Sequence, residues 1–328
     1  MGRWVGRSVA LAAVVTAACG GEGRNLTGPR APAPPVSGLA AGATVTVVSG
    51  ATGAALAGVN VTIGGQAAVT DASGQARLAA AAPPGTMVDL THPSHLDRQT
   101  RVRTGTGERF ILWPRTTPDG LSEHYTAKIV YTDSVIDPPA TVGALALWRV
   151  PQGTNTIVLV PSAELLADGA AMEAHAAAAR SATDASGGRV RVLLSQAAVS
   201  TGNSIVVTSR IDAADPECVA NRVRGYMDGE YGNYVIVSGA ILFCNMQIAR
   251  SSTVTHELGH AFGLQHAPLG SNDVMEPAFS SRRPTGFGPR ESLVLRMMLD
   301  REPGNRFPDS DRGLTVSSRR ERRRIVCG

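Results

Sequence analysis

Hydrophobic and polar residues alternate with a period of two along the first part of the chain that has a regular pattern. Five short stretches show this alternation: 44–48, 59–63, 87–90, 99–102 and 109–112. The period is that of a strand with one buried face. Residues 70–74 have turn composition and separate two of these stretches. Several short strands at close spacing predict a small all-β sandwich over residues 39–115.

The pattern changes after residues 116–123, where Pro118 and Gly120 interrupt any regular structure. Strand-like stretches follow at 128–131, 156–160, 189–194 and 204–207. Between them, residues 162–183 are rich in alanine and predict a helix that Ser162 could cap. Its apolar residues at helical spacing are Leu165, Leu166, Met172 and Ala176. Residues 291–299 predict a second helix, ended by Pro303 and Gly304. Strands that alternate with helices predict an α+β domain over residues 120–305.

The candidate chemistry lies in residues 255–266, which read T-H-E-L-G-H-A-F-G-L-Q-H. His256 and His260 are four residues apart, so on a helix they share one face and can hold one Zn²⁺. Glu257 is rotated by about 100° from His256 and can reach a water without being a ligand. Gly263 can take a positive φ, which would turn the chain and bring His266 back as a third ligand. The fourth position would stay open for water.

This H-E-x-x-H-x-x-G-x-x-H stretch resembles the zinc-binding signature of the metzincin metalloproteases, nearest to the matrixin-like enzymes. The resemblance implies an α+β metzincin-like fold, one catalytic Zn²⁺ held by His256, His260 and His266, and Glu257 as general base. Residues 271–277, S-N-D-V-M-E-P, resemble the Met-turn, which makes Met275 the methionine beneath the ligands. Ala267 and Pro277 depart from the better-known families and leave the subfamily open.

Residues 234–243 form an apolar run just before the zinc helix. In metzincins an edge strand in this region pairs with an extended peptide substrate, so the resemblance places the substrate edge here. A central core strand is the alternative. Residues 52–74 resemble carboxypeptidase regulatory-like, transthyretin-type domains and carry no catalytic set. For His92, His95 and His175, positions without a metal are favoured over a role as ligands.

The N-terminal residues predict export. Arg3 and Arg7 precede an apolar run at 9–17 that is too short to be a stable membrane span. The small residues before Cys19 resemble a bacterial lipoprotein signal over residues 1–19, in which Cys19 becomes lipidated. Ordinary signal cleavage and secretion are the alternative. Residues 20–38 are rich in Gly, Pro and Ala and predict a flexible linker.

Three cysteines remain after Cys19, which allows one disulfide in an exported protein. The pair Cys218 and Cys244 is favoured, although the sequence alone does not fix the pairing. Residues 306–328 predict a basic tail whose arginine cluster at 319–324 is solvated or binds acidic surfaces. A net charge of +4 with a single lysine does not indicate a nucleic-acid-binding protein. We expect the protein to be a monomer.

Together these observations predict an exported zinc metalloendopeptidase, anchored to a membrane as a lipoprotein, that acts on protein or peptide substrates. One rival is a cell-surface binding lipoprotein with a non-catalytic zinc site. The other is a small-amide hydrolase that uses the same zinc chemistry. Glu257 argues against the binding protein, because a structural zinc site needs no base beside its ligands. Cleavage of an unstructured protein would separate the endopeptidase from the small-amide hydrolase.

Overall fold

The computed structural model describes residues 38–103, 108–131, 147, 149–199, 202–220, 223–277, 283–311 and 320–327. The predicted signal peptide, the linker up to residue 37 and the lipidation candidate Cys19 lie outside these ranges. Within them, none of the helices combines the length and the apolar character needed to cross a bilayer.

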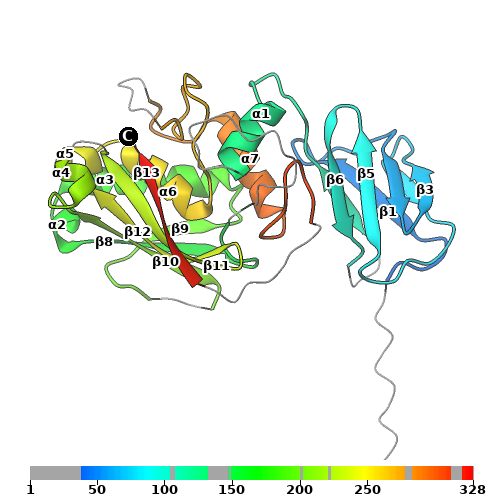
Figure 1. The fold of residues 1–328 in the computed structure, drawn as a ribbon, viewed down its shortest axis with the longest axis horizontal. Helices are drawn as coiled ribbons and strands as arrows, with labels where there is room; N and C mark the ends of the chain where they lie inside the picture. Colours follow the sequence, from blue (N-terminus) through cyan, green and yellow to red (C-terminus); the bar gives the residue numbers. More distant parts are fainter. Residues whose placement is uncertain are drawn as a thin grey trace, which may run out of the picture. The chain divides into compact units, whose positions relative to one another are not determined.

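The first part of the chain forms two small sheets that enclose one apolar core (Figure 1). The three-stranded sheet, in the order β4-β1-β7, contains β1 (Thr44–Ser49), β4 (Gln75–Arg77) and β7 (Arg109–Leu112). The four-stranded sheet, in the order β3-β2-β5-β6, contains β2 (Asn60–Ile63), β3 (Gln66–Val69), β5 (Met87–His92) and β6 (His95–Arg101). All five strand stretches predicted here are confirmed. Their alternate residues, such as Val45, Val47, Val61 and Ile63, are fully buried.

A six-stranded sheet, in the order β13-β11-β12-β10-β8-β9, organises the rest of the chain (Figure 1). Its strands are β8 (Thr156–Pro161), β9 (Arg191–Leu194), β10 (Ser204–Ile211), β11 (Gly225–Gly232), β12 (Val235–Phe243) and β13 (Arg320–Cys327). Four of them are parallel, whereas β11 and β13 run antiparallel to their neighbours. On β10, Ile205 and Val207 are buried while Thr208 is exposed, so one face of the sheet is covered and the other is open to solvent.

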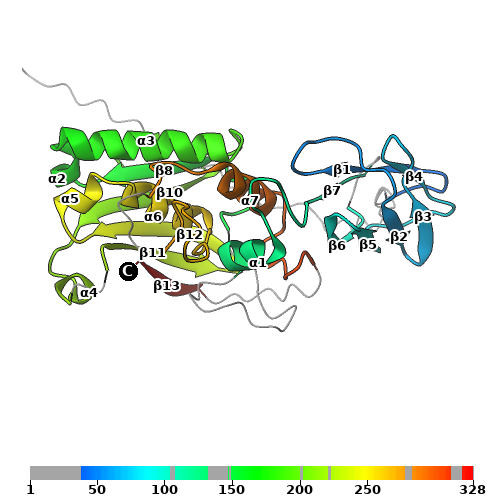
Figure 2. The same cartoon turned by 90° about the horizontal axis from the view of Figure 1, so that it is seen from above.

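Helices α3 (Gly169–Ala185) and α6 (Thr253–Phe262) pack against each other over the sheet (Figure 2). Four shorter helices, α1 (Glu123–Thr126), α2 (Ala163–Leu166), α4 (Pro216–Val219) and α5 (Met246–Ala249), and the longer α7 (Pro289–Leu299) complete the helices. A disulfide joins Cys218 to Cys244, with Cα atoms 5.2 Å apart, so the residue after β12 is tied to α4.

The helix predicted for residues 162–183 is divided in two. Asp168 begins α3 as its N-cap, because its side chain accepts a hydrogen bond from the backbone N–H of Ala171. Ser162 stands at the N-cap position of α2 but makes no capping hydrogen bond with its side chain. The buried face of α3 is made of small residues and His175, whereas Met172 is only partly buried.

The strand predicted for residues 128–131 is wrong. These residues belong to a short π-helical segment, η1 (Ala127–Tyr131), that continues directly from α1. Ser122 starts this helical run by accepting a hydrogen bond from the backbone N–H of Tyr125. Every side chain of η1 is buried, so its hydrophobic pattern lacks the period that separates a strand from a helix.

The prediction of residues 234–243 as the substrate edge is also wrong, because β12 lies between β10 and β11 and both of its edges are paired. The edge prediction failed because a continuous apolar run reads alike for a central strand and an edge strand. Strand β11 precedes β12 in the chain and runs antiparallel to it. Its outer side is paired with β13 along its whole length.

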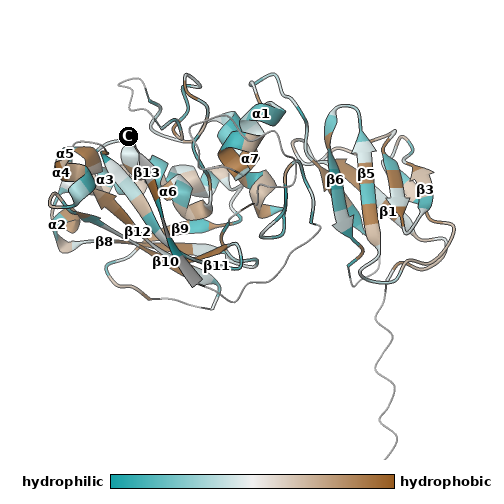
Figure 3. Cartoon of the chain, viewed as in Figure 1, coloured by the Kyte–Doolittle hydropathy of each residue, from teal (hydrophilic) through white to brown (hydrophobic). Residues whose placement is uncertain are grey.

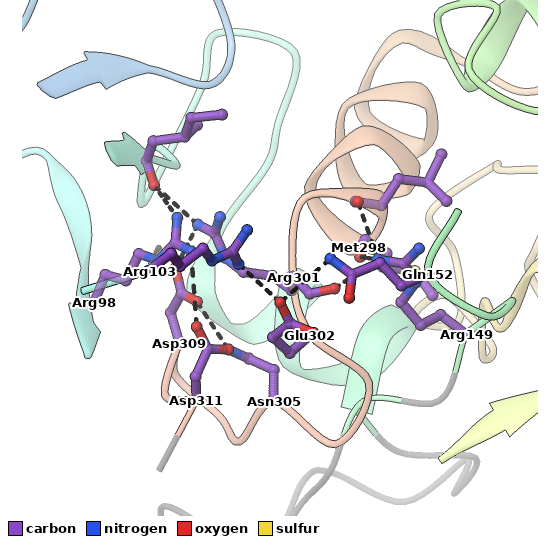
Figure 4. Close-up of polar contacts among 12 residues, drawn as sticks. Arg98, Arg103, Arg149, Gln152, Met298, Arg301, Glu302, Asn305, Asp309 and Asp311 are labelled. Atoms are coloured by element: carbon purple, nitrogen blue, oxygen red, sulfur yellow. Dashed lines mark hydrogen bonds and ion pairs between the residues drawn. The ribbon is translucent and has the colours of Figure 1, made fainter. Parts of the chain in front are cut away.

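The two described parts of the basic tail predicted for residues 306–328 are not free in solution, although Arg322 and Arg324 of its arginine cluster are exposed as expected. Residues 320–327 are strand β13, whose side chains are mainly hydrophilic (Figure 3). Residues 305–311 join a buried polar network (Figure 4). Asn305 donates to Asp309 and Asp311, and the fully buried Arg301 donates to Asp309 at 2.6 Å. Hydrogen bonds within the chain thus replace those to water, which composition alone does not reveal.

The same network reaches the β-sandwich. Arg98 on β6 lies 3.7 Å from the carboxylate of Asp311 and donates to the carbonyl oxygen of Ile111 on β7. Arg301 donates to the same carbonyl oxygen at 3.2 Å (Figure 4). These contacts lie within residues 36–328, which form one compact unit.

Candidate metal centre

Helix α6 carries the first two histidines of the predicted zinc set, and its end brings in the third. Gly263 ends the helix in the left-handed conformation, at φ 110°, which a residue without a Cβ adopts at little cost. The next residue returns a hydrogen bond from its backbone N–H to the carbonyl oxygen of Gly259. Gln265 then donates from its backbone to the carbonyl oxygen of Ile129 in η1, which fixes the path of the chain one residue before His266.

The three histidines meet as the spacing predicts. Their ligand-capable ring nitrogens all lie within 4.8 Å of one another, and the Nε2 atoms of His256 and His260 are 3.2 Å apart. Two nitrogens on a tetrahedral zinc at 2.0–2.1 Å would be separated by about 3.3 Å. Over the ranges that the structure describes, these histidines are the one group of three or more His, Cys, Asp or Glu placed to hold a metal ion.

Backbone carbonyls orient two of the rings. The Nδ1 of His256 lies 2.6 Å from the carbonyl oxygen of Val274, and the Nδ1 of His260 lies 2.7 Å from that of Leu264. A carbonyl oxygen can only accept, so we assign the ring proton to Nδ1, and the lone pair of Nε2 points toward the other rings. Burial and the neighbouring histidine rings lower the pKa of both side chains well below 6.5. The neutral form that binds a metal is therefore the stable form near pH 7.

Glu257 lies beside this cluster and faces strand β11. A Cβ placed on Gly225, the first residue of β11, would lie only 3.2 Å from Glu257 Oε1 and 2.8 Å from the carbonyl oxygen of Leu242. A glycine at this point is what lets the strand pass so close to the carboxylate. Glu257 itself is fully buried, as are its neighbours His256 and His260. The Glu257 carboxylate and the imidazoles of His256 and His260 are therefore all removed from solvent.

Met275 packs directly against α6, as the Met-turn resemblance implies. A Cβ placed on Gly259, between the two helical histidines, would lie 2.4 Å from Met275 Sδ. The backbone holds the methionine on both sides. Its carbonyl oxygen accepts from the N–H of Ala267, and its own N–H donates to Glu291 Oε1 at 2.9 Å. The residue after the third histidine is thus tied to the loop beneath the cluster.

Glu291 on α7 is a residue of this site that the sequence reading missed. It also accepts from the backbone N–H of Gly288, so one buried carboxylate fixes both the Met275 loop and the start of α7. Burial raises its pKa to about 7. A glutamate in the third position of a helix that follows Gly288-Pro289 is a recognisable capping signal. Its second hydrogen bond, to a loop 16 residues earlier, has no signature in the sequence.

A second group of polar contacts holds the loop that contains Met275, and it was not predicted from the sequence either. Arg290 contacts the carboxylate of Asp273 at 3.0 Å through Nε, and the hydroxyl of Tyr125 donates to that carboxylate at 2.8 Å. The Arg290 guanidinium stacks 4.7 Å above the ring of Tyr125. Helices α1 and α7 are thereby connected to the residue just before Val274, whose carbonyl oxygen orients His256.

Arg283 brings a positive charge close to the cluster. Its guanidinium charge contributes to the lowered pKa of both His256 and His260, and it donates a hydrogen bond to the carbonyl oxygen of Glu276. Two cations repel, so this charge favours the neutral, metal-binding form of the two rings. The sequence offers no spacing rule that would have linked Arg283 to the histidines.

The other histidines with a described environment are not part of this centre. His175 is buried under the sheet, with Nδ1 2.7 Å from the carbonyl oxygen of Ala171 and Nε2 3.0 Å from Ser209 Oγ. Both ring nitrogens are engaged within the core, as a structural histidine requires. His92 and His95 lie at the hairpin between β5 and β6.

Comparisons with known proteins add little to this geometry. No family model matches the sequence, and no match was found among the curated proteins. Among solved structures, one similar chain belongs to a type II cohesin–X-dockerin complex from Acetivibrio cellulolyticus, an N-terminal interface mutant, at 22% sequence identity. The similarity covers 22% of this chain and 58% of that chain, with a TM-score of 0.18. A match of this quality carries no argument about the fold or the activity.

Proposed function

We propose that the protein is an exported zinc-dependent metalloendopeptidase of metzincin type. The observation that carries this proposal is the fully buried carboxylate of Glu257, which directly follows the first of three converging histidines in the chain. A site that only binds a metal needs the histidines, and burying an acidic side chain beside them in the helix would cost free energy without a gain. The resemblance of residues 255–266 to the metzincin signature supports the same reading.

The three residues that would hold the metal are His256, His260 and His266. Their donor set suits zinc, because neutral imidazole nitrogens are preferred zinc ligands and three protein ligands leave one position for chemistry. When bound, Zn²⁺ supplies a Lewis acid that lowers the pKa of water toward about 7 and polarises a carbonyl group.

Glu257 would act as the general base. It removes a proton from the attacking water, whose oxygen bonds to the carbonyl carbon of the scissile peptide. It then delivers that proton to the nitrogen as the carbon–nitrogen bond breaks. The backbone contacts of His256 and His260 keep the rings in place while the proton moves.

Export and lipid anchoring belong to the same proposal and rest on the N-terminal sequence pattern. Fractionation of cells that make the natural chain and Cys19→Ala tests them. We expect the natural protein with the membranes and the variant in the soluble fraction. A natural protein that is already soluble and starts at another residue would remove the anchor from the proposal.

Digestion of casein tests the activity and separates it from both rivals. The purified protein should produce casein peptides, lose this activity with a zinc chelator, and regain it when zinc, but not magnesium, is restored. A small-amide hydrolase would leave casein intact under all conditions. A binding lipoprotein would bind zinc and cleave nothing.

A further inference from the structure

Strand β11 begins beside the candidate catalytic carboxylate, and its outer side is occupied by the chain itself. Gly225 stands next to Glu257. From that point, eight residues of β11 pair antiparallel with eight residues of β13, from Gly225 opposite Cys327 to Gly232 opposite Arg320. An extended segment of the chain thus lies along the strand whose first residue stands next to Glu257, with its Cys327 end at the Glu257 side.

The side chains of the two strands are complementary in charge on the open face of the sheet. Asp228 stands opposite Arg324, and Glu230 stands opposite Arg322. The Arg324 guanidinium lies 3.6 Å from Asp215 and 3.9 Å from Asp228, and it stacks 4.1 Å from the ring centroid of Tyr226. The carboxylates of β11 and of Asp215 therefore form an acidic row that favours arginine in the neighbouring strand.

The contacts that hold β13 are of a kind that another peptide can reproduce. Arg324 is 40% exposed, so its ion pairs at 3.6 and 3.9 Å are partly screened by water and salt. Ile325 is the one buried side chain among those that the structure describes in β13. The rest of the attachment is the backbone ladder, which any extended chain of the same direction can form.

We propose that the outer side of β11 is a peptide-docking edge, that β13 is its built-in occupant, and that the edge accepts in its place an extended peptide with arginines facing Asp228 and Glu230. The occupant and the incoming peptide compete for the same backbone groups. If the proposed function holds, β13 restrains the access of substrate to the site, and this consequence rests on that function. The replacement of β13 by another peptide is independent of the proposed function.

Peptide binding tests the exchange without any need for turnover. The probe is a fluorescein-labelled peptide with the sequence of residues 319–326, and every protein carries Glu257→Gln so that the probe is not consumed. Charge reversal in the occupant, Arg322→Glu with Arg324→Glu, should weaken β13 and raise the affinity for the probe at least tenfold. The matched control reverses two exposed arginines away from this edge, Arg77→Glu with Arg191→Glu, and should leave the affinity unchanged.

A second probe with glutamate at both arginine positions tests the charge preference. It should bind at least tenfold more weakly than the first probe, and Asp228→Ala should reduce that difference. Equal affinity of the first probe for the reversed and parent proteins would overturn the proposal, as would equal binding of the two probes.

Hydrogen exchange on the full-length chain keeps the test valid if the charge-reversal variant fails to fold. The amides of residues 320–327 should exchange well before those of β12, since β13 opens separately. Exchange of both strands in a single global step would mean that β13 is a permanent part of the sheet and would overturn the proposal. If the probe binds as expected but casein is not cleaved, the docking edge stands and the proposed enzymatic function fails. In a cleaving protein, the same charge reversal should increase casein turnover severalfold.

Discussion

Histidine rings lie close together at two places in this chain, and the two groups differ in what orients them. In the β-sandwich, the Nδ1 atoms of His92 and His95 are 3.2 Å apart, and Ser94 Oγ lies 3.1 and 3.0 Å from them. On helix α6, the Nδ1 atoms of His256 and His260 point away from each other toward backbone carbonyls. Their Nε2 atoms converge instead.

The difference shows that proximity of histidines does not make a metal centre. His92 and His95 hydrogen-bond with Ser94 and each other, and among the described residues no further ligand joins them to make a group of three. In the second group, carbonyl oxygens at Val274 and Leu264 fix the ring protons outward, and the turn at Gly263 supplies the third ring. Fixed acceptors and a third ligand are what distinguish the two.

The largest expected effect is on zinc content. His256→Ala should reduce bound zinc from about one ion per chain to near zero and abolish casein cleavage, because two imidazoles cannot complete the site. His95→Ala is the matched control, since it removes a buried histidine with a close histidine neighbour and should leave zinc bound. Metal analysis of both purified variants checks this. Zinc lost from His95→Ala and kept by His256→Ala would reverse the comparison.

A smaller effect on stability is expected from the packing of Met275 against helix α6. Gly259→Ala forces a Cβ to within 2.4 Å of Met275 Sδ, so the methionine or the helix must move. We expect destabilisation by about 1–3 kcal/mol in urea unfolding, the usual cost of overpacking, together with weaker zinc binding. Gly169→Ala, at the start of α3 with open space around it, should be neutral or slightly stabilising. Equal stability of the two variants would show that the Met275 contact is not tight.

The smallest expected effect is the loss of folding stability at acid pH that comes from His95 in the β-sandwich. Burial, followed by the charges of His92 and Arg115, lowers the pKa of His95 to about 4. The unfolded chain titrates near 6.5, so between these values the unfolded state binds more protons than the folded state. The contribution of His95 to stability is therefore complete above pH 6.5 and is lost as the pH falls toward 4.

His95→Gln should remove this part of the pH dependence, which amounts to at most about 1.4 kcal/mol per pH unit. Urea unfolding of both proteins at pH 7 and pH 4.5 gives the difference. The natural chain should lose more stability than the variant between the two pH values. Identical losses would show that His95 is solvated in the folded protein.

The convergence of His256, His260 and His266 could be predicted from the sequence because their relations are local. Positions four apart on a helix share a face whatever the rest of the fold is, and Gly263 marks the turn that brings His266 back. The strands of the sandwich were predictable for the same reason, since their alternation is a property of each strand alone. The Cys218–Cys244 bridge, favoured from the small number of cysteines, is present in the structure.

The rest of the site depends on contacts that no local pattern encodes. Glu291 reaches a loop 16 residues earlier, and Tyr125 reaches Asp273 across 148 residues. The prediction of a substrate edge at residues 234–243 failed for a similar reason, because the apolar content of β12 does not say which strands lie beside it. The arginine-rich composition of residues 320–327 suggested a solvated tail, although a strand is held by backbone groups that every sequence has.

The central claim is that Glu257 uses the metal rather than holding it. Glu257→Gln keeps the shape of the side chain and one acceptor oxygen but cannot take a proton at neutral pH. Zinc content and casein turnover should be measured on one preparation of this variant. The account predicts about one zinc per chain and turnover reduced by roughly 10²–10⁴, the usual contribution of a positioned general base. Turnover equal to that of the natural protein, or loss of zinc as complete as in His256→Ala, would contradict it.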